Sequence, residues 1–247
     1  MKRAFAVVFC LLPFAGQAAE VDRAREYAAC MNEARTKPKE AFDRAVAWRD
    51  LGGGPAADHC AAVALLNLGS PAEAAKRLEN LAQTLKQDAA FKARVLAQAA
   101  QAWMLGGDMA RAEAVASSAL VLQPDNAELF VDRAVIRAGR NDYKSAVMDL
   151  DRAVGLLPNR PDALVFRASA HRFLDNLDKA LADVERALAL DPNHPEGLLE
   201  RGILRRMKGN DAGARQDWMQ LLRNAPDGDT AAAARANLEK MDVKAGK

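Results

Sequence analysis

The chain has 247 residues, of which 28% are charged and 5% are aromatic. Its 35 lysines and arginines nearly balance its 33 aspartates and glutamates, which gives a formal net charge of +2. A chain with so little net charge has no broad electrostatic footprint for nucleic acid or an anionic lipid surface, so neither is expected as a partner.

Residues 1–18 have the pattern of a secretory signal peptide. A basic start, Lys2 and Arg3, precedes an apolar run of about a dozen residues, which is shorter than the roughly 20 that span a bilayer. The small residues Gly16 and Ala18 follow it, so we expect cleavage near Ala18 and a periplasmic or secreted protein. The alternative is an ordinary buried helix. Loss of the signal removes two positive charges and leaves 33 basic and 33 acidic residues.

Two irregular helix pairs are expected next. Residues 19–54 predict a degenerate hairpin, with helices broken at Pro38 and at a run of three glycines that ends at Gly54. Within residues 55–92, the segment Gly69-Ser70-Pro71 predicts a turn followed by a second helix. Neither pair shows the regularly spaced prolines and alanines of the segments that follow.

The cysteines favour a disulfide in this N-terminal region. Of three cysteines, Cys10 falls in the expected signal, which leaves Cys30 and Cys60. An even pair in an exported chain is most simply a disulfide, here closing a loop of about 30 residues. Its expected role is structural, because no Cys-x-x-Cys spacing suggests redox chemistry. The alternative is two unpaired, buried side chains on alanine-rich helices.

The rest of the chain repeats itself at a constant interval. The clearest markers are four prolines, each about 34 residues from the next: Pro124, Pro158, Pro192 and Pro226. Twelve residues before each proline stands an alanine: Ala112, Ala146, Ala180 and Ala214. Small residues let the two helices of a unit approach closely, and the proline ends the second helix. One helix pair cannot bury its apolar face alone, so neighbouring pairs must stack.

This pattern resembles the tetratricopeptide repeat, whose period is about 34 residues and whose helix pair ends in a proline. The resemblance implies an all-α fold, a right-handed α-solenoid of helix-turn-helix units. The register predicts four repeats, at residues 93–126, 127–160, 161–194 and 195–228. Residues 55–92 are similar to a divergent unit of the same kind. Residues 229–247 are expected to form a capping helix and a tail, because the last repeat would otherwise expose its core face.

An arginine and an aspartate recur at the same spacing in three of the repeats. The pairs are Arg133 with Asp149, Arg167 with Asp183, and Arg201 with Asp217. We expect each pair to be a structural ion pair that fixes the register of two helices, since desolvation offsets much of the attraction between buried charges. The alternative is that the arginines form a site for an acidic ligand.

In the tetratricopeptide family, the first helix of each repeat lines the inner surface, where peptides or helices are held. The resemblance therefore implies a mostly apolar partner-binding groove on these residues: Arg94, Gln101, Val131, Val135, Val165, Ser169, Arg172, Phe173, Leu199, Ile203 and Arg206. The lysine and asparagine with which some members grip a C-terminal carboxylate are replaced here. Such a trough suits an amphipathic helix or an extended apolar segment with an acidic group near Arg172 and Arg206. Alternatively, neighbouring helices cover the apolar residues.

No catalytic, metal or cofactor pattern stands out in the sequence. The histidines at 59, 171 and 194 lack metal-site spacing, and neither a Gly-rich phosphate loop nor a Ser-centred nucleophile elbow is present. We therefore expect a non-catalytic interaction scaffold or adaptor in the bacterial cell envelope, with a protein or peptide partner and without cofactor or metal. The alternatives are a solenoid that carries a small apolar or lipidic ligand, and an enzyme with an unrecognised site.

Overall fold

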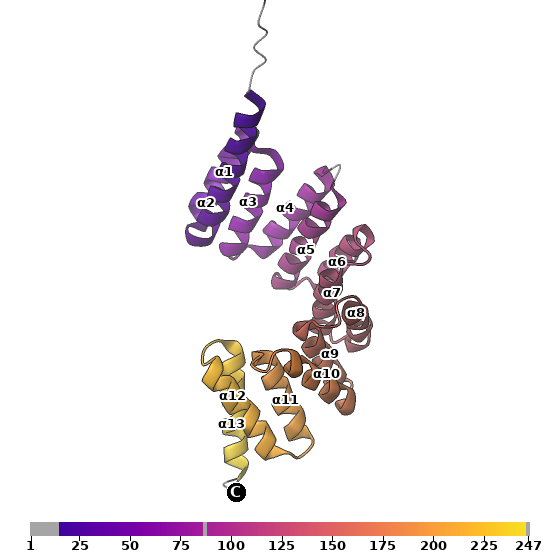
Figure 1. The fold of residues 1–247 in the computed structure, drawn as a ribbon. Helices are drawn as coiled ribbons and strands as arrows, with labels where there is room; N and C mark the ends of the chain where they lie inside the picture. Colours follow the sequence, from indigo (N-terminus) through magenta and orange to yellow (C-terminus); the bar gives the residue numbers. More distant parts are fainter. Residues whose placement is uncertain (1–14, 86–87, 246–247) are drawn as a thin grey trace, which may run out of the picture. The chain divides into compact units, whose positions relative to one another are not determined.

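The computed structural model describes residues 15–85 and 88–245. In these ranges the chain forms helices joined by short turns and contains no β-strand, which confirms the prediction of an all-α fold. The described residues divide into two compact units, an N-terminal unit (15–85) and a C-terminal unit (88–245) (Figure 1). The expected signal peptide lies outside the described residues, apart from the backbone of residues 15–18, which is helical.

The N-terminal unit consists of two helix pairs. Its helices are α1 (Ala15–Thr36), α2 (Pro38–Trp48), α3 (Gly54–Asn67) and α4 (Pro71–Thr84). Proline opens α2 and α4, a position where its missing N–H group would have no helical partner anyway. Between α2 and α3, Arg49–Gly53 form one π-helical turn in which Gly52 has φ of 93°, a left-handed conformation that glycine adopts without strain. The three glycines therefore produce a tight bend and not a long loop.

A disulfide between Cys30 and Cys60 links α1 to α3, with 6.2 Å between the two Cα atoms. The predicted disulfide is therefore present. Both cysteines are fully buried in a cluster otherwise built from alanines: Ala34, Ala41, Ala45, Ala61 and Ala64. Such small side chains bring the helices close but bury little apolar area per residue, so the covalent link adds stability that the core alone supplies weakly.

The C-terminal unit is an α-solenoid of four stacked helix pairs and a final helix. Its helices are α5 (Ala89–Leu105), α6 (Met109–Leu122), α7 (Ala127–Gly139), α8 (Tyr143–Leu156), α9 (Pro161–Phe173), α10 (Leu177–Leu190), α11 (Pro195–Met207), α12 (Asp211–Asn224) and α13 (Asp229–Ala245). The helices of each pair contact one another, and the first helices of successive pairs also contact: α5 with α7, α7 with α9, and α9 with α11. One face of the unit is therefore lined by first helices.

Recurring glycine, asparagine and aspartate residues form the turns and caps at which these helices end and begin. Within each pair, the turn contains a residue in the left-handed conformation, which glycine, asparagine and aspartate tolerate best: Gly107, Asn141, Asp175 and Gly209. Asp108 and Asp142 then cap the second helix by accepting backbone N–H bonds from Arg111 (3.0 Å) and Ser145 (3.1 Å). Asp88 caps α5 in the same way, so this helix begins about one turn before the residue 93 that the repeat register predicted.

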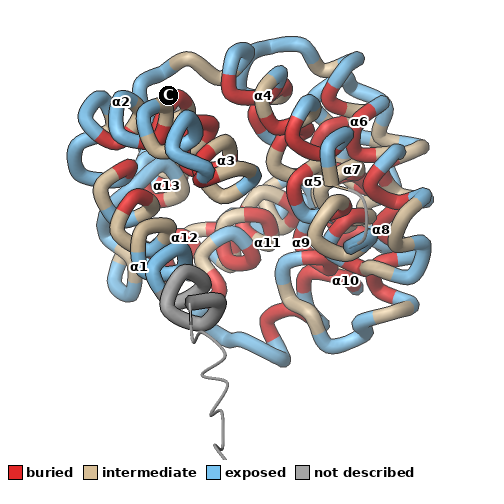
Figure 2. Tube along the Cα trace, turned by 90° about the horizontal axis from the view of Figure 1, so that it is seen from above, coloured by how far each residue is buried: buried red, intermediate tan, exposed pale blue. Residues whose placement is uncertain are grey.

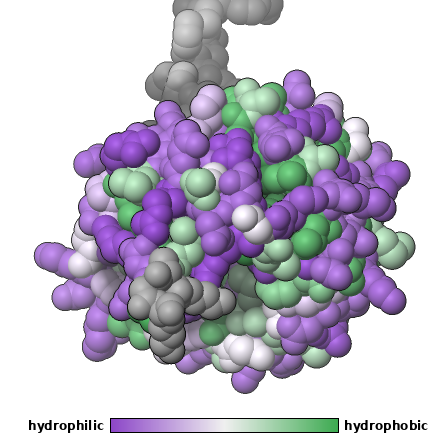
Figure 3. Space-filling view, turned by 90° about the horizontal axis from the view of Figure 1, so that it is seen from below, coloured by the Kyte–Doolittle hydropathy of each residue, from purple (hydrophilic) through white to green (hydrophobic). Residues whose placement is uncertain are grey.

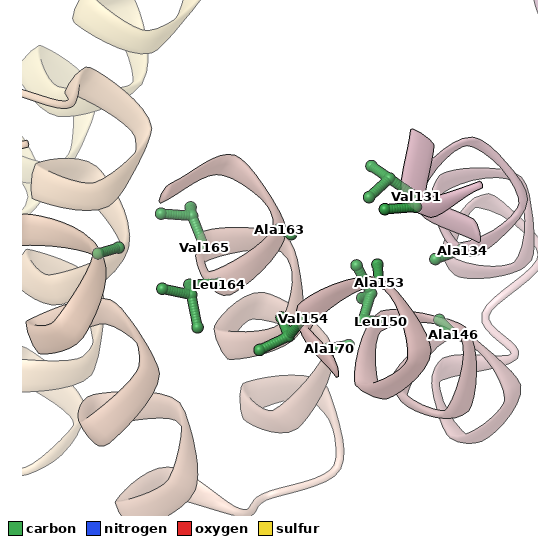
Figure 4. Close-up of a cluster of buried hydrophobic side chains, with 12 residues drawn as sticks. Val131, Ala134, Ala146, Leu150, Ala153, Val154, Ala163, Leu164, Val165 and Ala170 are labelled. Carbon is green, nitrogen blue, oxygen red and sulfur yellow. The ribbon is translucent and has the colours of Figure 1, made fainter. Parts of the chain in front are cut away.

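The core of the C-terminal unit runs between its helix layers. Figure 2 shows buried residues alternating with exposed ones along each helix, as expected when one side packs on a neighbour. In the middle of the unit, Ala134 of α7, Leu150 of α8 and Leu164 of α9 belong to one buried cluster (Figure 4). Alanine at many core positions keeps the helices close and leaves the larger side chains to fill the remaining space.

In the last repeat, a tryptophan packs against a glycine in the core. Trp218 is fully buried on α12, and its indole N–H donates to the Leu199 carbonyl at 3.2 Å. A Cβ atom on Gly202 would lie 2.2 Å from the indole nitrogen, so only glycine fits there. The preceding repeat has Ala168 and Val184 at these two positions. The larger ring is thus matched by a smaller residue facing it.

Helix α13 contacts both α11 and α12. Its side chains Ala231, Ala234 and Met241 are buried in the same cluster as Trp218. It therefore covers apolar surface that the last helix pair would otherwise expose. Within the residues described, no helix combines the length and apolar character that crossing a bilayer requires.

Candidate functional site

A small apolar pocket lies between α7, α8 and α9. It encloses about 170 Å³ and is lined by these residues: Ala134, Val135, Ala138, Tyr143, Leu150, Phe166, Ser169, Ala170 and Phe173. The rings of Tyr143 and Phe173 stack with their centroids 4.3 Å apart and 5° between their planes. Phe166 and Phe173 remain 41% and 54% exposed, which is high for aromatic side chains. The pocket therefore has an ordered aromatic wall and an open mouth.

A second hollow adjoins this apolar pocket. It encloses about 430 Å³ between the end of α5, the inner side of α7 and the start of α9, and its polar lining residues are Gln101, Glu128, Asp132, Arg160 and Asp162. Val135 and Phe166 line both hollows, so the two lie next to each other. The apolar pocket and this polar hollow together are called the groove below.

Asp132 is the least compensated charge in the groove. Its only described polar partner is the neutral side chain of Gln101, whose amide donates to Oδ1 at 3.3 Å. Burial raises the pKa of the Asp132 carboxyl, and the Gln101 hydrogen bond opposes this rise only in part. The neighbouring Glu128 carboxylate is paired with Arg160, which also lies 3.8 Å from Asp162. The one guanidinium lining the polar hollow is thus engaged elsewhere.

Several of the predicted groove residues meet here. Gln101, Val131 and Val135 line the polar hollow, and Val135, Ser169 and Phe173 line the apolar pocket. Leu199 and Ile203 are half-buried against the core around Trp218, and neither they nor Arg94 and Arg206 line either hollow.

Two expectations about the groove need correction. Val131 and Val165, expected in an open trough, are 6% and 5% exposed and belong to one buried hydrophobic cluster (Figure 4), although Val131 still borders the polar hollow. Arg172, expected near an acidic group of the ligand, donates instead to the buried carboxylate of Glu200 at 2.6 and 3.3 Å. Its guanidinium also lies over the Phe173 ring, 4.4 Å from the centroid. Arg172 is therefore neutralised within the protein.

The sequence prediction missed Asp132, Tyr143 and Phe166. Asp132 and Phe166 occupy the sixth position of successive repeats, next to the fifth position that was assigned to the groove. Tyr143 opens α8, a second helix, and was not considered for the inner surface. For Tyr143 and Phe166 the available signal was the rarity of aromatic residues, which make up 5% of this chain.

The recurring arginines and aspartates form a separate set of contacts between helices. Arg133 donates to Asp149 through two nitrogens at 2.9 and 2.7 Å, and Arg137 donates to the same carboxylate at 2.8 Å. Asp149 is 3% exposed, and its carboxylate raises the pKa of the Arg133 guanidinium. Arg201 and Arg205 surround Asp217 in the same way. These carboxylates occupy the arginines that were considered for an acidic ligand.

The third repeat departs from this arrangement. Arg167 donates to Asp183 at 2.8 and 2.6 Å, but the position of the second arginine is taken by His171. His171 is 8% exposed, and its Nδ1 atom has no hydrogen-bond partner among the described residues. Burial lowers the pKa of this imidazole. Burial therefore favours the neutral form of His171.

Comparisons with known proteins agree with this fold. The structure of MamA (residues 41 to the end) from Desulfovibrio magneticus RS-1 has a TM-score of 0.58 at 22% identity, covering 75% of this chain and 97% of MamA. YrrB, a TPR protein described as having an unusual peptide-binding site, gives 0.53 at 20% identity, covering 73% and 91%. The Cut9–Hcn1 structure gives 0.65 at 16% identity, covering 90% of this chain and 44% of that one.

The sequence comparisons give the family. No curated protein shows significant similarity to the chain. The tetratricopeptide repeat model, however, matches residues 100–171 and 169–239, which is more than half of the chain. The chain belongs to the tetratricopeptide repeat family.

Proposed function

We propose that this protein is an interaction scaffold or adaptor of the bacterial cell envelope, which holds a peptide or helix of a partner in its groove. The observation that carries the proposal is the apolar pocket, with its stacked Tyr143–Phe173 wall and half-exposed Phe166. On the face shown in Figure 3, hydrophobic side chains form patches among hydrophilic ones. Exposed apolar patches on a water-facing protein usually mark interaction sites.

The size of the apolar pocket favours a protein side chain as the occupant. A dry apolar cavity of about 150 Å³ holds one benzene molecule. The pocket of about 170 Å³ therefore has room for one aromatic or branched aliphatic side chain. The apolar pocket is too small to enclose a whole lipid acyl chain, so its size argues against the alternative of a lipid carrier.

The envelope setting is supported by two independent features. Residues 1–18 have the basic, apolar and small-residue order of a secretory signal. The Cys30–Cys60 disulfide suits an oxidising compartment, since thiols stay reduced in the cytosol. The mass of the protein recovered from the periplasm tests this part directly, because cleavage after Ala18 leaves a chain that starts at Ala19.

Site-specific crosslinking in living cells tests the holding function. A photoreactive phenylalanine analogue replaces Phe173, which is 54% exposed in the groove, or Val121, which is 81% exposed on α6. We expect a discrete protein adduct from position 173 and none from position 121. Equal crosslinking from both positions would contradict the groove assignment, and a lipid adduct at position 173 would favour the carrier instead.

A further inference from the structure

The groove has an unbalanced negative charge next to its apolar pocket. Three carboxylates line the polar hollow, those of Glu128, Asp132 and Asp162, against the single guanidinium of Arg160. Arg160 is held by Glu128 and lies near Asp162, which also bonds the His194 ring at 2.9 Å. In the part of the chain that the structure describes, no lysine or arginine forms an ion pair with Asp132, whose carboxylate accepts only from the Gln101 amide. A cation from outside would therefore meet a carboxylate that nothing else neutralises.

The position of Asp132 ties this charge to the apolar pocket. Asp132 and Val135 are three residues apart on α7, which places them on the same helix face about 4.5 Å apart along the axis. Val135 and Phe166 line both hollows. An extended peptide advances about 3.3 Å per residue. A segment whose apolar side chain enters the pocket thus brings the next one or two residues alongside Asp132.

We propose that the groove selects segments in which a lysine or arginine lies one or two residues from a large apolar side chain. The apolar side chain fills the pocket of Tyr143, Phe166 and Phe173, and the cation bonds the Asp132 carboxylate. This inference rests on the proposed function and specifies the chemistry of the partner. The sequence predicted an acidic group on the ligand near Arg172 and Arg206. The inference reverses this expectation, because Arg172 is paired with Glu200 and Arg206 lines neither hollow.

The energetics of Asp132 agree with this assignment. The burial that raises the pKa of Asp132 makes its charged form costly in the free protein. A bound lysine or arginine offsets that cost through a charge-assisted hydrogen bond, which is stronger than one from a neutral donor such as Gln101. Binding of a basic segment and ionisation of Asp132 therefore favour each other. Affinity for such segments should fall as the pH drops through the raised pKa of Asp132.

Selection from a random peptide library displayed on phage tests the inference. The baits are the full chain, its Asp132→Asn variant and the matched control Asp125→Asn, which removes an equal charge at an aspartate whose side chain is 80% exposed. The asparagine at 132 can still accept the Gln101 hydrogen bond, so the variant should fold, and its thermal melt checks this. We expect the unmodified chain and the control to enrich peptides with lysine or arginine within two residues of an aromatic or large aliphatic residue.

The Asp132→Asn variant should keep the apolar preference and lose the basic one. A peptide selected on the unmodified chain should bind this variant about tenfold or more weakly, as loss of a hydrogen bond to a charged group implies. Peptides enriched without a basic preference, or a preference that survives in Asp132→Asn, would overturn the inference and leave the proposed function standing. Failure of the unmodified chain to enrich any peptide would contradict both.

Discussion

The two units of this protein hold their helices together with different chemistry. In the C-terminal unit, buried aspartates such as Asp149 and Asp217 each bind two arginines and join the helices of a repeat. The ion pairs described in the N-terminal unit lie at the surface, as between Arg44 and Glu26, and its alanine-rich core contains the Cys30–Cys60 disulfide. Three of the four regular repeats carry their own Arg–Asp link between helices. Where the pattern degenerates, a covalent link connects α1 to α3.

The largest effect is expected from breaking a buried link in the C-terminal unit. Asp149→Ala leaves the guanidinium group of Arg133 without a carboxylate in a largely buried site, while Arg137 keeps its ion pair with Glu113. Loss of one partner from a buried ion pair typically lowers the free energy of unfolding by about 3–5 kcal/mol. Denaturant-induced unfolding, followed by circular dichroism, measures the change.

Asp151→Ala is the matched control for this substitution. Asp151 also binds an arginine, Arg167, but its side chain is 57% exposed. Exposed ion pairs contribute at most about 1 kcal/mol, so this variant should stay close to the unmodified protein. Equal losses in the two variants would show that burial of the carboxylate does not distinguish the links.

The disulfide should matter nearly as much, but in the other unit. Replacing Cys30 and Cys60 by alanine removes a link across a separation of 30 residues, for which loop-closure entropy predicts a loss of about 3–4 kcal/mol. Hydrogen–deuterium exchange should become faster in α1 and α3 and stay unchanged in α7 and α8. A reducing agent should reproduce the effect in the unmodified protein and add nothing in the variant. Faster exchange throughout the C-terminal unit would contradict the separation of the two units' stabilities.

The smallest expected effect is on the pH dependence of stability. It concerns His171, which replaces the second arginine in the repeat at residues 161–194. Because burial lowers the pKa of His171 below about 6.5, the unfolded chain binds a proton there more readily than the folded one. The resulting stability is fully present above the unfolded pKa and is lost as the pH falls through the folded pKa. The charged groups around the ring are those of Asp151, Arg167, Lys179 and Asp183.

His171→Gln is neutral at every pH and removes this proton linkage. The variant should therefore lose less of its unfolding free energy between pH 7 and pH 5 than the unmodified protein does. Parallel stability curves for the two proteins over this range would show that His171 is not responsible for the acid sensitivity.

The repeat architecture was predictable because it depends on residues that recur at fixed spacings along the sequence. The regular spacing of prolines and alanines predicted the helix pairs, and the constant spacing of Arg133 from Asp149 and of Arg201 from Asp217 predicted contacts that the structure contains. The even cysteine pair predicted the disulfide for a similar reason, since few pairings were available.

The open face of the first helices was not predictable in the same way. Successive residues of a helix point about 100° apart, so a shift of one position separates buried Val165 from groove-lining Phe166. The pairing of Arg172 with Glu200 depends on how one repeat stacks on the next, across 28 residues of sequence. These features follow from the packing of neighbours and leave little trace in any single repeat.

The central claim, that the groove between α7 and α9 holds a segment of a partner protein, is tested most directly by peptide affinity. A peptide selected on the full chain is titrated against Phe166→Ser and against Met148→Ser, whose methionine is 68% exposed on α8 outside the lining of either hollow. Phe166→Ser removes the apolar contact between the Phe166 ring and the bound peptide, which should weaken binding by about tenfold or more. Binding to Met148→Ser should not change. Unchanged affinity for Phe166→Ser would contradict the account.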